Sequence, residues 1–388
     1  MKSNYKALNE LIEKVDERNA DGAITELIGV SIDKCFIKSV ANTNGTDLSK
    51  YKIIRKNEFA VSLMQVSRDS KIPVARLEDY EVAIMSPAYP IFRVKDTRKI
   101  LPEYLDMWFK RPEFDREAAF IAVGGVRGSM PWEEFVKMEL PVPTIEKQLE
   151  IVNSYKAITE RIVLKQKIND NLLAQAQTYF GSLFANKYSD EKLPDDWKFA
   201  KVGDYCIENT GNLSKNDSFD TILYLDTGSI TDNYIFELQE LNLATDEIPS
   251  RAKRKVTHGD IIYSTVRPNL RHYGLLQNPP GNLIVSTGFS VLHNTGLGVS
   301  NDFLFMWLTT KSILEYLQSI AENSVSTYPS LNVSDLLNVE IIVPDSMTLA
   351  KINCFLNAIF SAISENNKQI KVLTSGLNTL LPKLLSSR

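Results

Sequence analysis

The sequence predicts a mixed α/β protein built from two similar α+β modules and two long helices. The string YLDMW at residues 104–108 returns as FLFMW at 303–307, about 200 residues later. PVP at 141–143 returns as IVP at 342–344 at a similar offset, and each copy then runs into a stretch with coiled-coil spacing. Repetition in this order predicts a fold with pseudo-two-fold internal symmetry.

The composition is that of an ordinary globular protein large enough for two domains. The chain has 388 residues, of which 44% are hydrophobic and 24% charged. We find no apolar run at the N-terminus and no stretch near the roughly 20 apolar residues that cross a bilayer, so we expect a cytoplasmic protein without a membrane span. The three cysteines share no spacing, which predicts reduced thiols rather than disulfides or a zinc site.

The chain divides into four predicted blocks. Residues 1–143 form a first module, 144–187 a central helix, 188–343 a second module and 344–388 a C-terminal helix. Alternating or buried apolar patterns predict strands at 59–63, 83–85, 91–94, 260–264 and 283–286, and helices at about 102–120 and 301–322.

The two long helices share one 4–3 register of seam positions. In the C-terminal helix these are Ile352, Leu356, Ile359, Ile363, Asn366, Ile370, Leu373, Leu377, Leu380 and Leu384. In the central helix they are Ile151, Tyr155, Ile158, Ile162, Lys165, Asn169, Leu172, Ala176, Tyr179 and Leu183. The polar interruptions Lys165 and Asn366 are equivalent, and such a residue can fix register and orientation. We predict an antiparallel coiled coil; the alternative is two core helices, each packed on its own module.

The length of the helices has a consequence for spacing. Each ~35-residue helix is roughly 50 Å long. One turn of DNA measures about 34 Å, so an antiparallel pair could hold two reading modules one turn or slightly more apart.

The net charge of −4 argues weakly against nucleic acid, but local patches decide binding. Residues 251–272 are strongly basic, with Asp260 as their single acid. Arginine can bond a guanine edge and asparagine an adenine edge, whereas lysines and hydroxyls can hold phosphates. The predicted DNA contacts are Gln65, Arg68, Lys71, Arg127 and Ser129 in the first module and Lys253, Arg254, Ser264, Arg267, Asn269, Arg271, His272, Ser326 and Tyr328 in the second. The alternative is a solvated basic loop.

We find no convincing catalytic or metal-binding constellation in the sequence. NPPG at 278–281 begins like the Asn-Pro-Pro-aromatic loop of amino-methyltransferases, but Gly281 replaces the aromatic residue, which indicates a turn. His258, His272 and His293 lack partners at metal-ligand spacing. The sequence therefore predicts a binding protein that holds no cofactor.

Several motifs together resemble the specificity subunit of Type I restriction–modification systems. LPDDW at 193–197 with VGD at 202–204 looks like the opening of a target recognition domain, and GDIIYSTVRP at 259–268 with STGF at 286–289 looks like its middle. LPVP at 140–143 followed by EKQ at 146–148 looks like the entry to a conserved helix of the family. The second copy departs here, because Leu349 stands where the first has Gln148.

The resemblance implies two target recognition domains, at 1–143 and 188–343, separated by two conserved helices that pair antiparallel. Each domain would read one half of a split double-stranded DNA target, asymmetric here because the two loops differ. The helices would set the spacer and dock two methyltransferase subunits, and restriction/translocase subunits would join the complex. The chain itself would be no enzyme. S-adenosylmethionine, ATP and magnesium would lie on its partners, in the cytoplasm of a bacterium or archaeon.

Two other classes of protein remain open from the sequence. A non-catalytic scaffold that binds protein partners through two similar modules explains the acidic balance better, but not the loop rich in Arg, Asn and Tyr. A single-chain enzyme fused to reading modules is the second alternative, and the missing cofactor motifs argue against it.

Overall fold

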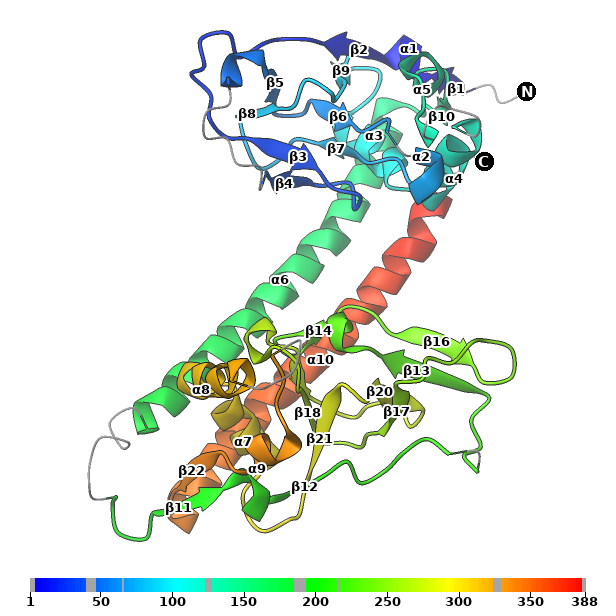
Figure 1. The fold of residues 1–388 in the computed structure, drawn as a ribbon. Coiled ribbons are helices and arrows are strands. Elements are labelled where there is room, and N and C mark those ends of the chain that lie inside the picture. The colour runs from blue at the N-terminus through cyan, green and yellow to red at the C-terminus, as the bar shows by residue number, and fades with distance from the viewer. Residues whose placement is uncertain are drawn as a thin grey trace. The chain divides into compact units, whose positions relative to one another are not determined.

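The computed structural model describes residues 4–39, 47–64, 66–122, 128–184, 193–214, 216–323 and 329–385 (Figure 1). The chain forms two compact units. Unit 1 comprises Met1–Val163 with Ile370–Arg388, and unit 2 comprises Leu164–Gln369. Each unit contains one mixed module and part of each long helix, so the division passes through the helices, whereas the predicted boundaries lay at their ends.

The module of unit 1 is built on a four-stranded antiparallel sheet of order β2-β9-β6-β7. Smaller pairs are β1-β10, β3-β4 and β5-β8. The strands are β1 (Tyr5–Ala7), β2 (Ile12–Val15), β3 (Ile28–Val30), β4 (Phe36–Lys38), β5 (Lys52–Arg55), β6 (Phe59–Val61), β7 (Val74–Arg76), β8 (Val82–Met85), β9 (Ile91–Val94) and β10 (Glu139–Pro141). The helices are α1 (Leu8–Leu11), α2 (Val66–Asp69), α3 (Pro102–Phe109), α4 (Pro112–Ile121) and α5 (Trp132–Phe135), with a 3-10 turn η1 (Leu48–Lys50).

The module of unit 2 has the corresponding sheet, of order β12-β21-β18-β19, and a second sheet of order β16-β13-β20-β17. Its strands are β11 (Lys198–Lys201), β12 (Cys206–Glu208), β13 (Thr221–Leu225), β14 (Ile230–Thr231), β15 (Tyr234–Ile235), β16 (Gln239–Asn242), β17 (Ala252–Lys255), β18 (Ile261–Ser264), β19 (Tyr273–Leu275), β20 (Leu283–Ser286), β21 (Phe289–Asn294) and β22 (Glu340–Val343). Its helices are α7 (Asn301–Leu308), α8 (Lys311–Glu322) and α9 (Val333–Leu337), with 3-10 turns η3 (Val202–Asp204), η4 (Thr227–Ser229) and η5 (Pro268–Leu270).

The internal repeat is therefore a repeat of topology. Pair β1-β10 corresponds to β11-β22, pair β5-β8 to β17-β20, and helices α3, α4 and α5 to α7, α8 and α9. The turn before the central strand is also repeated. Glu58 accepts a hydrogen bond from Arg55 N at 2.8 Å, and Asp260 accepts one from Thr257 N at 2.7 Å. The mixed α+β class and the duplicated architecture are confirmed.

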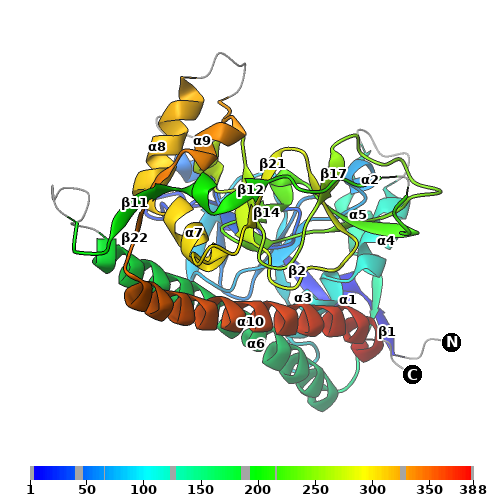
Figure 2. The same ribbon diagram turned by 90° about the horizontal axis from the view of Figure 1, so that it is seen from below.

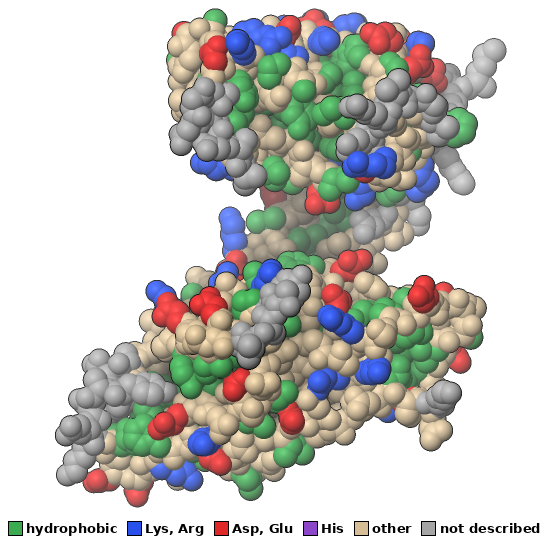
Figure 3. Space-filling view, in the orientation of Figure 1, with side chains coloured by type: hydrophobic (Ala, Val, Ile, Leu, Met, Phe, Trp, Pro, Cys, Tyr) green, Lys and Arg blue, Asp and Glu red, His purple; other side chains and the backbone are tan. Residues whose placement is uncertain are grey.

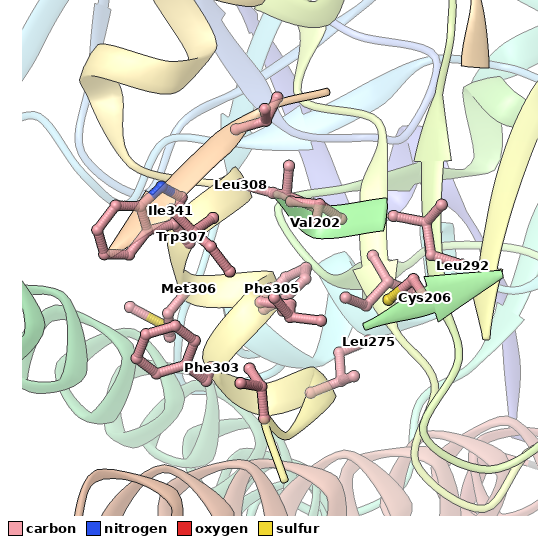
Figure 4. Close-up of a cluster of buried hydrophobic side chains, with 14 of the residues drawn as sticks. Val202, Cys206, Leu275, Leu292, Phe303, Phe305, Met306, Trp307, Leu308 and Ile341 are labelled. Atoms are coloured by element: carbon pink, nitrogen blue, oxygen red, sulfur yellow. The ribbon is translucent and has the colours of Figure 1, made fainter. Parts of the chain in front are cut away.

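The core of each module forms around aromatic side chains of the helix that follows its sheet, α3 in unit 1 and α7 in unit 2. In unit 2, Figure 4 shows Phe303, Phe305 and Trp307 of α7 gathered with residues of the neighbouring strands. Trp307 Nε1 donates to Glu340 O at 3.0 Å, which ties α7 to β22. In unit 1, the Tyr104 hydroxyl donates to Pro141 O at 3.0 Å and ties α3 to β10 in the same way.

The two predicted helices at 102–120 and 301–322 are each broken into a pair. Pro112 ends the first one, because proline lacks an N–H and pushes the preceding Arg111 into an extended conformation (φ −75°, ψ 137°). The second breaks at Thr310, which is also extended (φ −65°, ψ 147°), while Thr309 donates its hydroxyl back to Phe305 O. The apolar pattern ran through both breaks and hid them.

The long helices are α6 (Ile145–Phe184) and α10 (Ser346–Leu385). Within unit 2 they pack side by side and antiparallel (Figures 1 and 2). Tyr179 meets Phe355 with ring centroids 4.7 Å apart, while Lys165 Nζ, earlier in α6, donates to Asn366 Oδ1, later in α10, at 3.1 Å. Asn366 Nδ2 also donates to Asn169 Oδ1 at 2.9 Å. The equivalent polar positions of the two helices, Lys165 and Asn366, therefore bond to each other within unit 2.

The predicted seam residues are placed as follows. Ile151, Ala176, Ile352, Leu356, Ile359, Ile363 and Ile370 are buried, and Tyr155, Ile158, Ile162, Lys165, Asn169, Leu172, Leu183, Asn366, Leu373 and Leu377 are half-buried. Tyr179 and Leu380 are exposed, and the side chain of Leu384 lies outside the described ones. Phe180 and Phe184, off the seam, bury their rings against Phe303 instead.

By length and composition alone, α10 is long and apolar enough to cross a membrane. An 18-residue window within Ser346–Leu377 reaches a mean hydropathy of 1.3. The apolar side chains of this helix that face unit 2, including Ile352, Leu356 and Phe360, are buried in that unit's core. Length and composition alone do not distinguish such a core helix from a membrane span.

The difference between Gln148 and Leu349 has a structural cause. Gln148 is completely buried, and its amide makes three bonds of 2.9 Å, accepting from Leu101 N and donating to Lys99 O and Pro143 O. This side chain thereby fastens the start of α6 to the loop before α3. Leu349, in the equivalent place of α10, is buried among apolar side chains.

We predict that Gln148→Leu destabilises unit 1 by about 2–4 kcal/mol, because three backbone groups lose the buried amide that pairs with them. Gln177→Leu, at an exposed position of α6, is the matched control and should change stability by less than about 0.5 kcal/mol. Urea unfolding with hydrogen exchange would measure both. Equal stability of the two variants would contradict the assigned role of Gln148.

Candidate DNA interface

The loop between β18 and β19, residues 265–272, carries most of the predicted contacts, and we call it the arginine loop. Two of its residues have left-handed backbone conformations, Arg267 (φ 49°, ψ 71°) and Arg271 (φ 57°, ψ 36°), on either side of η5. Residues other than glycine hold such a conformation only where their surroundings fix it. The loop is thus expected to be strongly anchored.

Its anchors are backbone hydrogen bonds from neighbouring elements. Arg267 N donates to Pro329 O at 3.0 Å, and Leu331 N donates to Thr265 O at 2.7 Å. Asn269 N donates to Gln318 Oε1 of α8 at 3.1 Å. The backbone groups are thereby satisfied within the protein, while the side chains of Arg267, Asn269 and Arg271 are exposed.

Asp232, in the turn between β14 and β15, holds the far end of the arginine loop. Its carboxylate lies 3.2 Å from Arg271 Nη1 and accepts a hydrogen bond from the Tyr273 hydroxyl at 2.8 Å. Its backbone N donates to Arg271 O at 2.9 Å. Burial, and then the nearby Asp232 carboxylate, raise the pKa of Tyr273, so its hydroxyl stays protonated as a donor.

Unit 1 has an equivalent loop around α2, residues 62–72, which we call the α2 loop. Met130 N donates to Leu63 O at 2.8 Å, as Leu331 N does to Thr265 O in unit 2. Gly128 packs so closely that a Cβ there would lie 2.5 Å from Ser67 Oγ. In both units, the loop after the central strand and the loop before α5 or α9 therefore form one surface, although the sequence suggested them as separate candidates.

A pair of opposite charges recurs in the two loops. Lys71 Nζ lies 4.0 Å from Asp33 Oδ1, and Arg271 Nη1 lies 3.2 Å from Asp232 Oδ2. Both aspartates lie in the connection that follows the first strand of the β3-β4 or β13-β16 pair. Each module therefore sets a carboxylate beside the last basic residue of its loop.

A buried ion pair supports the α2 loop from beneath. Lys34 Nζ lies 2.8 Å from Asp115 Oδ1 of α4, and only 6% of the lysine side chain is exposed. Lys34 Nζ also donates to Phe109 O, and Asp115 Oδ1 accepts from Ile72 N at 3.0 Å. Burial lowers the pKa of Lys34, and Asp115 opposes that shift.

The remaining predicted contacts divide into three groups. Arg68, Lys71 and Lys253 are exposed, Arg68 being paired with Asp69 at 2.8 Å, and Ser129 is half-buried. Arg254 is half-buried on β17, and burial lowers the pKa of its guanidinium. Gln65, Arg127, Ser326 and Tyr328 lie outside the described residues.

The structure buries Ser264 and leaves His272 half-buried, so of these two predicted contacts only Ser264 is corrected. Ser264 is buried, and its hydroxyl donates to Val266 O at 3.1 Å, so it shapes the loop and does not reach the surface. His272 directs Nδ1 inward, 2.6 Å from Ile230 O, where it ties the loop to β14. Each residue lies at the end of a strand, where the alternation of inward and outward side chains breaks off. The sequence alone therefore could not show which way the two side chains point.

Arg251 belongs to the same surface, although the sequence did not single it out as a contact. Its carbonyl accepts from Thr287 N at 2.9 Å, and the next residue, Gly288, accepts from Thr265 N at 3.1 Å. These bonds place the exposed Arg251 beside the start of the arginine loop. Its position at the head of the basic run 251–255 was the available signal.

The surroundings of this surface are not uniformly basic. Figure 3 shows basic and acidic side chains interspersed on the visible faces of both units, as the net charge of −4 requires. NPPG at 278–281 lies in the connection between β19 and β20, and within the described residues no group of His, Cys, Asp and Glu could hold a metal ion.

Comparisons with known proteins agree with this geometry. Residues 194–374 match the family described as Type I restriction modification DNA specificity domain. The Type I restriction enzyme HindI specificity subunit of Haemophilus influenzae is 29% identical over 157 residues, which are 40% of this chain and 34% of that protein. The MjaIX specificity subunit of Methanocaldococcus jannaschii is 23% identical over 309 residues, 74% of this chain and 68% of that protein.

The fold itself has a solved counterpart. The crystal structure of the Type-I restriction-modification system S subunit from M. genitalium aligns with a TM-score of 0.59 at 15% identity, covering 99% of this chain and 96% of that one. The fold and the loops thus define a class of protein in which two similar modules are connected by a pair of long helices. The family match over residues 194–374, together with the two specificity subunits, confirms the resemblance to specificity subunits of Type I systems.

We predict that Lys34→Met destabilises unit 1 by about 3–5 kcal/mol, because it leaves the Asp115 carboxylate without its buried partner. Lys38→Met is the control, since that side chain is 78% exposed, and its effect should stay below about 1 kcal/mol. Chemical denaturation would measure both. If the two variants were equally stable, the Lys34–Asp115 pair would not support the α2 loop.

Proposed function

We propose that this chain is the DNA-reading subunit of a Type I restriction–modification complex. The observation that carries the proposal is the equivalence of the two loops. Both are held by an equivalent backbone hydrogen bond on the same scaffold, yet they expose different side chains. A common frame with different exposed groups is what reading two different short DNA sequences requires.

The arginine loop is suited to direct reading of base edges. Arg267 and Arg271 present guanidinium groups that can donate two parallel bonds to guanine O6 and N7, and Asn269 can pair with adenine. Because the backbone of the loop is fixed by its anchors, little backbone conformational entropy is lost when the loop binds. Arg251 and Lys253, at the side of the loop, are placed to hold phosphates.

The proposed target is split and asymmetric. Unit 2 would read its half with Arg267, Asn269 and Arg271, whereas the described part of the α2 loop offers Arg68 and Lys71. Different donors read different bases, so the two halves of the target should not be copies of each other.

The paired helices α6 and α10 would set the spacer between the two halves and dock two methyltransferase subunits. Leu164 and Ile168 of α6 are 59% and 42% exposed, and apolar side chains of this kind favour contact with a partner. Restriction/translocase subunits would join the same complex. We place it in the cytoplasm of a bacterium or archaeon.

The chain would do no chemistry of its own. S-adenosylmethionine, ATP and magnesium would be bound by the partner subunits, and methyl transfer would fall on an adenine flipped out of each half-site. The alternative of a protein-binding scaffold explains the acidic balance but gives no role to the anchored arginine loop.

The half-site assignment can be tested with Arg267→Ala and Arg271→Ala in the full chain assembled with its methyltransferase subunits. Each change should weaken discrimination at one base pair of the unit 2 half-site by about 1–3 kcal/mol and leave the other half unchanged. Methylation of a library of randomised duplexes would measure this.

Arg98→Ala is the control, because Arg98 is 89% exposed on unit 1 and lies in neither loop. It removes the same charge and should not change the sequence preference. If all three variants weakened binding to every sequence alike, the arginines would be general phosphate contacts.

A further inference from the structure

The hairpin formed by β14 and β15 exposes two aromatic rings. Tyr234 is 37% exposed and Phe236 is 61% exposed, and their ring centroids lie 5.1 Å apart in an edge-to-face arrangement. The hairpin turns through Asp232 and Asn233, both with positive φ (47° and 65°), the conformation of a tight two-residue turn. Two adjacent exposed aromatic rings form a small apolar patch, and patches of this kind mark interaction sites.

The hairpin is fixed to the sheet and does not hang free. Asn233 N donates to Tyr273 O at 3.0 Å, and Asn233 Oδ1 accepts from Leu275 N at 2.8 Å. Ile230 is buried beneath it, and its Cδ1 would lie 2.7 Å from a Cβ at position 274, so Gly274 permits this close seating. The aromatic pair is therefore presented on a rigid support.

The exposed rings adjoin the arginine loop. Tyr234 pairs directly with Thr231 across the hairpin, so the two side chains share a face. The Thr231 hydroxyl lies 3.2 Å from His272 Nδ1, at the end of the arginine loop. Phe236 follows two residues after Tyr234 on the same face, as their ring contact requires.

This feature belongs to unit 2 alone among the residues that the structure describes. In unit 1 the corresponding connection, between β3 and β4, is a short turn at residues 31–35. The hairpin is thus an addition to one module. Its turn contains Asp232, whose carboxylate forms the ion pair with Arg271.

We propose that Tyr234 and Phe236 form an aromatic wedge that stacks on an unstacked base step of duplex DNA beside the half-site read by the arginine loop. The proposal rests on the proposed DNA-reading function. Side chains of this kind insert between base steps, and stacking on one base is worth about 5- to 150-fold in affinity. The exposed Glu237, next along the chain, disfavours phosphate, so the rings would meet bases and not the backbone.

The test uses the full chain assembled with its methyltransferase subunits and a duplex with 2-aminopurine at the base step that flanks the unit 2 half-site, away from the target adenine. In the double variant Y234A/F236A, affinity should fall about 5- to 150-fold, and the fluorescence rise that reports unstacking should be lost. The salt dependence of binding should not change, because no phosphate contact is removed. Arg271→Ala should instead relax base preference without abolishing the fluorescence rise.

Two further variants keep the result interpretable. Phe236→Leu retains the apolar bulk but not the second stacking ring; it should fold normally and lower the affinity less than the double variant does, because Tyr234 remains. Phe199→Ala removes an aromatic ring that is 51% exposed on β11 and should bind as the parent chain does.

Unchanged affinity and fluorescence in Y234A/F236A would overturn the wedge and leave the DNA-reading function standing. Loss of subunit assembly with normal DNA affinity would also overturn it and assign the rings to a protein contact. If the parent complex bound no duplex DNA specifically, the proposed function would fail first, and the wedge with it.

Discussion

The arrangement depends on one hydrogen bond that occurs twice, from the loop before α5 or α9 to the loop after the central strand. In unit 1 it joins Met130 N to Leu63 O, and in unit 2 Leu331 N to Thr265 O. Because this bond satisfies backbone groups of both loops, it holds two segments far apart in sequence as one surface. Side chains on that surface can vary without loss of the frame, whereas the backbone that carries them cannot.

The two modules use this frame differently. Unit 1 supports its loop with a buried pair, Lys34 and Asp115, while unit 2 relies on α8 and on the β14–β15 hairpin. The strained conformations of Arg267 and Arg271 are maintained by these outside contacts. The hairpin then adds two exposed rings at the edge of the arginine loop. The two modules thus differ mainly in these loops and in the contacts that anchor them, whereas the sheet is the same in both.

Much of the architecture was predictable from the sequence because it rests on local periodicity. Strands β9 and β20 fall where apolar runs predicted them, and the shared register of α6 and α10 predicted their pairing. The polar interruptions that the register marked as equivalent, Lys165 and Asn366, bond to each other. The helix breaks were missed because the apolar pattern continues through Pro112 and Thr310. The roles of Asp232 and Gln148 depend on hydrogen bonds between residues far apart in the sequence, and a periodic pattern does not predict such bonds. The inward orientation of Ser264 and His272 escaped prediction for the same reason.

The central claim is that this chain selects the sequences that a methyltransferase complex modifies. The most direct measurement is a genome-wide map of adenine methylation in the host, with the gene present and with it deleted. The account predicts a split motif with two different halves that is methylated when the gene is present and disappears on deletion. An unchanged methylation pattern, in cells that express the partner methyltransferase subunits, would contradict it.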